Sequence, residues 1–305
     1  MSFEEKIKQK ALSLGFDIVG ITSADDIDKQ QLSEFKQWLA QGCNGGMEFL
    51  ARAPEKRFSP SNILPEAKSI ICAAINYKCN VPENPDFKIA SYALYPDYHN
   101  FIKNKLSELA EYLKTFDPNL KFKICVDSSA IAEKALAMRA GIGFIGKNRL
   151  ITNQKFGSFL LLGEIITNFT LQPDEPIKKQ QCGNCMKCVQ ACPSGALNEN
   201  GFDAAKCISY LTIEHKGEID TALKNKIPPH LFGCEECLLA CPYNTESPIC
   251  EKAQYGFEAK NVNFTISEIL KFSKQQFDEF TKDSVMNRTG LDRIKRNALL
   301  CRDFK

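Results

Sequence analysis

Eight cysteines in the C-terminal half constrain this chain more than any other feature. The first run reads Cys182-Gly-Asn-Cys185-Met-Lys-Cys188-Val-Gln-Ala-Cys192-Pro193, which is the spacing C-x2-C-x2-C-x3-C-P. A second run, 234–242, repeats the ending C-x2-C-x3-C-P but lacks the first cysteine, and Cys207 upstream is the obvious replacement. This spacing holds cubane clusters in two-cluster ferredoxins. The segment is therefore expected to fold around two [4Fe–4S] clusters.

In such proteins the last cysteine of each run ligates the cluster of the other run. The predicted ligands of cluster 1 are Cys182, Cys185, Cys188 and Cys241, and those of cluster 2 are Cys192, Cys207, Cys234 and Cys237. Paired C-x2-C spacings also build zinc sites. Four cysteines in one run before proline, with the ending repeated, do not fit a zinc ribbon. The six remaining cysteines are interpreted as ordinary free thiols.

The bulk composition favours a redox enzyme over a secreted disulfide framework. Fourteen cysteines in 305 residues, with no apolar leader behind the charged N-terminus, suggest metal or redox chemistry in a cytoplasmic protein. No run is apolar enough for a membrane span. The formal net charge of +2 excludes the strong overall basicity of many nucleic-acid binders but leaves room for a local patch.

The first 170 residues alternate between helix and strand patterns. Ser2 and Glu5 have capping-box spacing at the start of a helix that ends before Gly15. Helical periodicity also marks segments around 32–39, 102–113 and 131–139, and apolar strand patterns fall at 16–21, 69–77, 121–126 and 158–167. The expected architecture is a layered α/β (α+β) domain.

The rest of the chain divides at changes in composition. The polar, proline-containing segment 171–181 is typical of a linker, and one helix is expected around 267–280. The predicted domains are 1–175, an α/β catalytic domain; 176–250, a ferredoxin-like dicluster domain; and 251–305, a helical basic segment that packs on the core.

Three motifs in the first domain carry a resemblance to a known family. These are Val126-Asp-Ser-Ser129, then Ala140-Gly-Ile-Gly-Phe-Ile-Gly-Lys-Asn148, then Gly157-Ser-Phe-Leu-Leu-Leu-Gly-Glu164. With Lys56-Arg57, Asp97-Tyr-His99, Cys207-Ile-Ser-Tyr-Leu211 and Ile294-Lys-Arg-Asn-Ala298, they resemble the epoxyqueuosine reductases from about residue 10 to residue 300. Many members continue into a helical-repeat extension, so tRNA contacts made there are in doubt for this chain.

That resemblance implies a cobalamin- and iron–sulfur-dependent oxidoreductase that reduces epoxyqueuosine to queuosine in tRNA, the last step of queuosine synthesis. It implies Asp127 as proton donor and cobalamin contacts at Arg57, Ala90, Asp127, Ile151, Leu162, Ser209, Cys234 and Glu235. It also implies cobalamin without a histidine on cobalt, so His99, His215 and His230 are interpreted as satisfied or solvent-facing. A carboxyl donor near neutral pH needs a raised pKa, which we expect from burial. Without the resemblance, Asp127 would be interpreted as the N-cap of a helix near residue 130.

The C-terminal segment 288–305 has six basic and two acidic residues, which suits RNA phosphates. The predicted tRNA contacts are Lys216, Arg293, Lys295 and Arg296, and a solvated amphipathic helix is the alternative. The glycines at 141, 143 and 146 match the dinucleotide fingerprint formally, but they follow a helix pattern rather than a strand. We expect a monomer that takes electrons from a flavodoxin or ferredoxin. The alternatives are a reductive dehalogenase-like enzyme and a dicluster electron carrier.

Overall fold

The computed structural model describes residues 1–81, 84–177, 181–260 and 262–304. Its centre is a four-stranded sheet in the order β1-β2-β7-β4, and every neighbouring pair is antiparallel. The strands are β1 (Ile18–Ser23), β2 (Ser69–Asn76), β4 (Phe122–Cys125) and β7 (Leu160–Thr167). All eight residues of β2 are buried. Because the strands of this sheet are all antiparallel, the domain takes the α+β form of the expected architecture.

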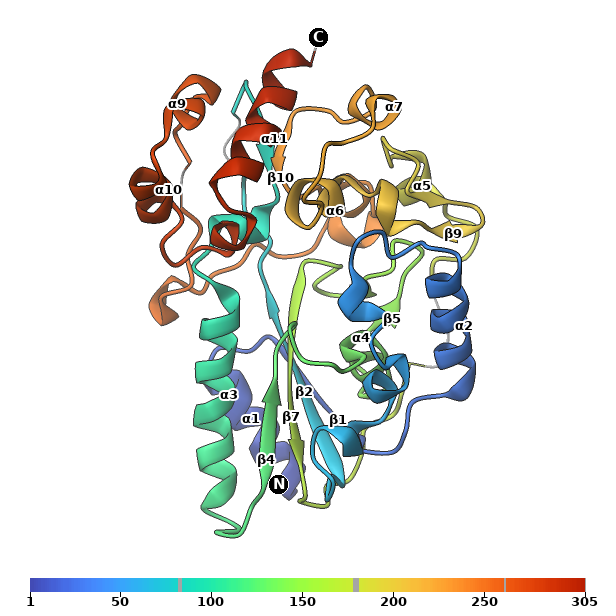
Figure 1. Ribbon diagram of the computed structural model, residues 1–305. Helices are drawn as coiled ribbons and strands as arrows, with labels where there is room; N and C mark the ends of the chain where they lie inside the picture. The colour runs from blue at the N-terminus through green and yellow to red at the C-terminus, as the bar shows by residue number, and fades with distance from the viewer. Residues whose placement is uncertain (82–83, 178–180, 261, 305) are drawn as a thin grey trace.

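Helices cover both faces of this sheet (Figure 1). On one face, α1 (Phe3–Ser13) and α3 (Tyr98–Lys114) pack through Ile7, Ile102 and Leu106. On the other face lie α4 (Glu133–Arg139) and α2 (Lys29–Ala40). The predicted capping box of α1 is confirmed, because Ser2 and Glu5 each accept a hydrogen bond from the other's backbone amide.

The glycine-rich segment after α4 forms a tight hairpin rather than a nucleotide-binding loop. It pairs β5 (Phe144–Ile145) with β6 (Ile151–Thr152). A Cβ on Gly143 would lie 2.5 Å from the Thr152 carbonyl oxygen, so only glycine allows this approach of the two backbones.

The cysteine-rich segment folds into short elements that lie above the sheet in Figure 1. They are α5 (Lys187–Gln190), β8 (Leu197–Asn198), β9 (Gly201–Phe202), α6 (Ile208–Ile213), α7 (Thr221–Lys224), β10 (His230–Phe232) and α8 (Glu236–Leu239). The helices α5 and α8, one from each cysteine run, pack against each other. This contact brings the two runs together.

The expected helix around 267–280 is wrong as a single element. The chain forms α9 (Ile266–Lys271) and α10 (Lys274–Phe280), separated because Ser273 starts a new capping box with Gln276. The last helix, α11 (Leu291–Asp303), packs on α9 and on β10. No helix in the described ranges is both long and apolar enough to cross a bilayer.

The three expected domains share contacts in the fold. The short strand β3 (Lys88–Ile89) pairs in parallel with β10, and Phe87 and Leu94 share a hydrophobic cluster with residues of α9 and α11. The expected linker is also attached: the Asp174 carboxylate accepts from the Ile21 amide, and Leu171 is buried. Residues 178–180 of that linker lie outside the described residues. The division at 175 and 250 stays a prediction.

Candidate active site

The seven cysteines of the two runs and Cys207 lie close to one another in the fold. Burial raises the pKa of Cys188, and its charged neighbours are Cys182, Cys241 and Cys185. Burial likewise raises the pKa of Cys234 to about 12, and its thiol neighbours are Cys207 and Cys192. Cys237 has Cys234, Cys207 and Cys192 beside it, and Cys188 of the first run as well. These neighbours are compatible with the crossed assignment, which stays a prediction, and Cys237 with Cys188 as a neighbour places the two sets close together.

A lysine from the catalytic domain fixes the loop of the first run. The Lys147 ammonium donates hydrogen bonds to the carbonyl oxygens of Gly183 and Cys185, at 2.8 and 2.9 Å. Lys147 follows the glycine hairpin at β5, so this hairpin positions the first cysteine loop against the sheet domain.

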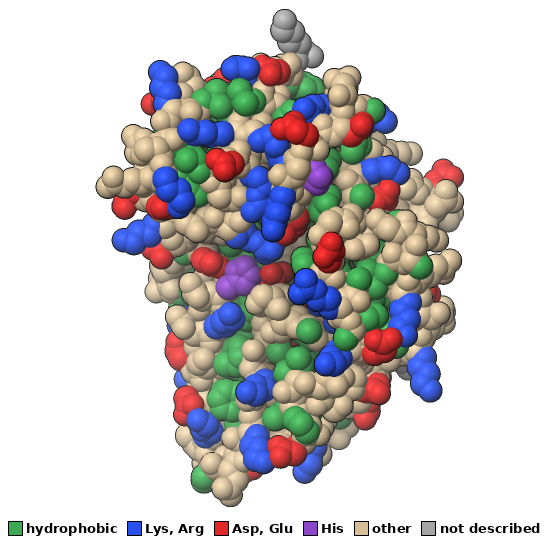
Figure 2. Space-filling model, in the orientation of Figure 1, with side chains coloured by type: hydrophobic (Ala, Val, Ile, Leu, Met, Phe, Trp, Pro, Cys, Tyr) green, Lys and Arg blue, Asp and Glu red, His purple; other side chains and the backbone are tan. Residues whose placement is uncertain are grey.

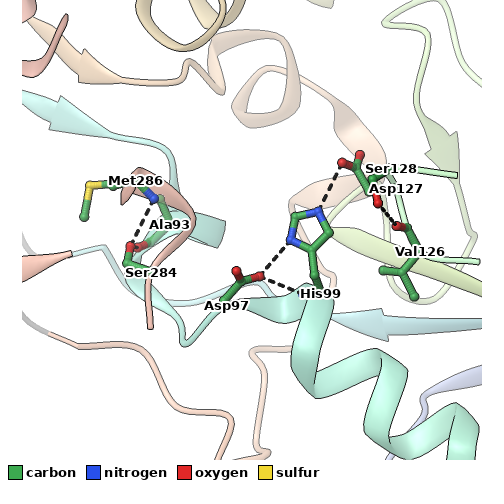
Figure 3. Close-up of polar contacts among 8 residues, drawn as sticks. All are labelled: Ala93, Asp97, His99, Val126, Asp127, Ser128, Ser284 and Met286. Carbon is green, nitrogen blue, oxygen red and sulfur yellow. Dashed lines mark hydrogen bonds and ion pairs between the residues drawn. The ribbon is translucent and has the colours of Figure 1, made fainter. Parts of the chain in front are cut away.

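Asp127 lies at the carboxyl end of β4, in contact with the N-terminus of α3. His99 sits between two carboxylates: its Nδ1 is 2.7 Å from Asp97 Oδ1, and its Nε2 is 3.1 Å from Asp127 Oδ2 (Figure 3). Asp97 also caps α3 by accepting from the His99 amide. Burial alone lowers the pKa of His99, but both carboxylates stabilise its charged form and raise the pKa to about 9. The imidazole therefore carries a proton at neutral pH.

Two expectations for Asp127 are wrong in this structure. Its pKa is lowered rather than raised, because the hydrogen bond from His99 outweighs burial. The side chain is also 46% exposed, so the burial that was expected at the strand end is incomplete. The N-cap interpretation fails too, because the N-cap of α4 is Ala132 and no side chain caps this helix. The proton of the pair therefore rests on His99.

Besides Asp97, three residues of this site were not assigned to it from the sequence: His99, Glu133 and Glu164. Glu133 begins α4 and accepts a hydrogen bond from the Asp127 amide through Oε1. Burial raises the pKa of Glu133 to about 7, and the charge of Asp127 adds to the effect. Glu164 lies on β7 between Cys72 and Cys125 and is fully buried. Neither of its carboxyl oxygens has a partner among the described residues, and burial raises its pKa strongly.

A signal for two of these residues was present in the sequence. The Asp-x-His motif at 97–99 places a carboxylate and an imidazole two positions apart, and Glu164 is the one acidic residue of an apolar strand. Nothing in the sequence linked Glu133 to Asp127. The histidines away from the site have internal partners: His215 bonds the Glu218 carbonyl, and His230 bonds the Pro228 carbonyl.

The expected cobalamin contacts lie around the same side of the sheet and on the cysteine segment. Ala90 and Glu235 are linked through Ser91, whose amide and hydroxyl both donate to the Glu235 carboxylate. Among the remaining positions, Ile151 is buried, and Leu162 and Ser209 are half-buried. Arg57 contacts the ring and the carbonyl oxygen of Phe49.

Two buried donors make this region suitable for a large polar-edged ligand. Arg57 Nε and Asn148 Nδ2 have no hydrogen-bond partner in the described part of the chain. A buried donor without a partner is costly, so an acceptor from a ligand would stabilise both. Half-buried Leu160 and Leu162 expose aliphatic surface from β7. This combination of unpaired donors and aliphatic surface fits a corrin ring with amide substituents.

The residues expected to contact tRNA differ in whether their charged groups already form hydrogen bonds within the protein. The Arg293 guanidinium donates to the carbonyl oxygens of Thr289, Ile213 and Arg288, and Arg296 donates to those of Leu211, His215 and Gly217. These bonds satisfy carbonyls at the end of α6, so both arginines connect α11 to α6. Lys216 is exposed, and half-buried Lys295 lines a hollow of about 790 Å³ beside α11. Basic side chains gather over this upper half of the molecule (Figure 2).

Comparisons with known proteins place these features in a family context. Residues 57–128 match the family model described as epoxyqueuosine reductase QueG, DUF1730, and residues 181–244 match a 4Fe-4S double cluster binding domain. The epoxyqueuosine reductase of Leadbetterella byssophila is 34% identical over 305 residues, covering 99% of both chains. That of Escherichia coli is 34% identical over 96% of this chain and 79% of its own.

Solved structures agree with the sequence relatives. An epoxyqueuosine reductase bound to an epoxyqueuosine-modified tRNA-Tyr stem loop superposes with a TM-score of 0.88, at 32% identity over 98% of this chain and 80% of that one. A Bacillus subtilis epoxyqueuosine reductase, whose catalytic aspartate loop is swung out of the active site, gives a TM-score of 0.87 at 32% identity, with the same coverage.

Proposed function

The chain belongs to the epoxyqueuosine reductase family, and from that premise we propose that it reduces epoxyqueuosine in tRNA to queuosine, the last step of queuosine biosynthesis. Two electrons and two protons are required: both carbon–oxygen bonds of the epoxide break, a carbon–carbon double bond forms, and the oxygen leaves as water. The site must therefore supply electrons on one side and protons on the other. The observation that carries the proposal is the Asp97–His99–Asp127 array beside a dicluster segment.

Electrons enter through the two groups of cysteines. Cys182, Cys185, Cys188 and Cys241 are proposed to hold one [4Fe–4S] cluster, and Cys192, Cys207, Cys234 and Cys237 the other. The thiol of Cys237 lies near that of Cys188, which supports direct electron transfer between adjacent clusters. A small external carrier such as a flavodoxin or ferredoxin is the proposed donor, and a monomer suffices because all eight cysteines come from one chain.

One of the two protons comes from the array at Asp127, and the second must be taken up from solvent. The His99 imidazolium passes its proton across the hydrogen bond to Asp127 Oδ2, and Asp127 delivers it to the departing oxygen as a general acid. Asp97 keeps the ring oriented and stabilises its charged form. Because His99 is charged up to a pKa of about 9, the array is loaded at neutral pH even though the Asp127 carboxyl itself is ionised.

Cobalamin is the proposed partner of the clusters at this site. When bound, it supplies a strongly reducing cobalt centre that can act on the epoxide carbon. Arg57 and Asn148 would donate to its amide oxygens, Leu162 and Ile151 would pack against the ring, and Ala90, Ser209, Cys234 and Glu235 would line the side formed by the cysteine segment. The half-exposed Asp127 would then be covered by cofactor and substrate.

The tRNA substrate is proposed to approach over the basic surface formed by α6, α7 and α11 (Figure 2). Lys216 and Lys295 offer ammonium groups to phosphates there. Lys224 lines the same hollow as Lys295, where it pairs with Glu218. Arg293 and Arg296 contribute positive potential while they hold α11 against α6.

Two measurements test the proposal. Anaerobically purified protein is analysed for iron, sulfide and cobalt, with about eight irons per chain expected for two cubanes. The loaded protein, supplied with a chemical reductant, is then incubated with tRNA that contains epoxyqueuosine, and the nucleosides are separated by mass. Queuosine should appear in proportion to enzyme. Protein with both clusters and cobalamin bound that yields no queuosine would contradict the assigned reaction.

A further inference from the structure

We propose that Glu133 is a positioning residue that latches the loop carrying Asp127 into the active site. The proposal rests on the proposed function, since it assumes that Asp127 acts on the substrate. It concerns the contact between the first turn of α4 and the loop 127–132, and it adds to the reaction a residue that touches neither substrate nor cofactor.

The backbone of Asp127 needs an external support. Its φ is 51°, in the left-handed region that residues with a side chain avoid, at a cost of about 1 kcal/mol or more. The chain turns sharply here, because the Ser128 amide bonds back to the Val126 carbonyl at 2.6 Å. A residue in this conformation stays there only if surrounding contacts hold it.

The loop is tied at its two ends. Asp127, Ser128 and Ala130 are exposed, and the far end is held where the Ala132 amide donates to the Arg57 carbonyl. At the near end, the Asp127 carboxylate bonds to His99 and the Asp127 amide bonds to Glu133. The first contact involves the acid that must exchange protons during turnover. The second uses only the backbone of Asp127, so it can persist through the reaction.

Glu133 is well placed to act as the fixed side of this contact. It belongs to α4, which is anchored by the buried Leu136 and Ala137 against the sheet. With a pKa of about 7 the Glu133 carboxyl is charged in part at neutral pH, and a hydrogen bond from an amide to its charged form is stronger than one between neutral groups. The Bacillus subtilis relative with its catalytic aspartate loop swung out is a second observation, since in that protein the corresponding loop has been found away from the site.

Hydrogen–deuterium exchange on the full chain with its clusters tests the latch without requiring turnover. In Glu133→Ala the Asp127 amide should exchange on the order of tenfold faster, as expected for the loss of one net hydrogen bond of about 1.4 kcal/mol. Glu133→Gln keeps an oxygen acceptor without the charge and should fall between wild type and Glu133→Ala. Glu111→Ala, at an exposed position on α3 that pairs with Lys114, is the matched control and should change nothing.

Kinetics separate positioning from structural damage. Glu133→Ala should lower kcat while KM for tRNA stays unchanged, because the proposed tRNA-binding lysines lie on other elements. Asp127→Asn should lose turnover but keep a slowly exchanging loop, since its amide still reaches Glu133. If Asp127→Asn were fully active, Asp127 would not be the proton donor, while the latch could still be measured; wild-type protein that yields no queuosine would instead contradict the proposed function. An unchanged Asp127 amide in both Glu133 variants, or faster exchange throughout α4, would overturn the latch.

Discussion

The replacement Asp127→Asn should change the titration of a neighbouring residue, and this provides a direct test of the proton array. In the folded protein the pKa of His99 is raised from 6.5 to about 9 against the effect of burial. That difference of about 2.5 pH units corresponds to roughly 3 kcal/mol favouring the imidazolium. Two carboxylates produce it, and Asp127 contributes more than Asp97.

Asparagine removes the charge of Asp127 but keeps its shape. His99 then retains Asp97 as a charged partner, and burial continues to oppose its ionisation. We expect the pKa of His99 to fall by at least about one unit, to between about 7 and 8. The sign follows from the missing attraction, since removing a negative neighbour destabilises the charged ring and lowers its pKa.

The titration can be followed by NMR of isotope-labelled imidazole groups, because the chain has only three histidines. His99→Gln identifies the His99 signal by its disappearance. Asp97→Asn is the matched control and should also lower the pKa of His99, by less. A wild-type His99 that titrates near 6.5, or one unaffected by Asp127→Asn, would refute the array and leave Asp127 without a proton source.

The same array predicts a pH dependence of stability. A histidine whose pKa is raised on folding stabilises the protein fully below its unfolded pKa of 6.5, and the contribution disappears as pH rises through about 9. Wild type and His99→Gln should therefore differ most in unfolding free energy at about pH 6 and converge above about pH 9. Turnover of Asp127→Asn should fall on the order of 100-fold or more, as for the loss of general acid catalysis.

Three further predictions concern other parts of the molecule. Cys241→Ala should damage the cluster whose other ligands lie in the upstream run, and Cys192→Ala should damage the cluster whose other ligands lie downstream. Electron paramagnetic resonance of each variant shows which cluster is lost. Loss of the opposite cluster in each variant would show that the crossed assignment is wrong. The double variant Lys216→Gln, Lys295→Gln should bind tRNA more weakly. The slope of log K against log salt should fall in magnitude by about 0.7–0.9 for each phosphate that is no longer neutralised. An unchanged slope would show that these lysines do not contact tRNA phosphates. Glu164→Gln should fold, and its unfolding temperature should exceed that of wild type by a margin that grows as pH rises. The reason is that a carboxyl whose pKa is raised on folding destabilises the folded protein above its ordinary pKa. An equal difference in unfolding temperature at about pH 5 and pH 8 would contradict a buried neutral acid.

The sequence predicted those features whose cause is local. The helix that Ser2 caps and the strand 69–77 follow from side-chain spacing and from a continuous apolar run, and the structure contains both. The cysteine spacing predicted a segment for two clusters, and residues 181–244 match a 4Fe-4S double cluster binding domain, while the crossed assignment of the ligands stays a prediction. The helix around 267–280 failed for an equally local reason, a second capping box at Ser273 that the apolar periodicity concealed.

The charge state of Asp127 could not be obtained from the sequence, because it is decided by residues that are distant along the chain. Burial at a strand end suggested a raised pKa, yet His99, 28 residues away, lowers it. The left-handed backbone of Asp127 and its contact with Glu133 likewise exist only after α4 packs on the sheet. A carboxylate that must be a strong acceptor for His99 and then a donor to substrate cannot keep one pKa throughout. The contacts of this structure favour the proton on His99, and cover from a bound substrate would raise the cost of the Asp127 charge and move the proton toward Asp127. Substrate binding would thus protonate Asp127, and for this reason its lowered pKa in this structure is compatible with acid catalysis.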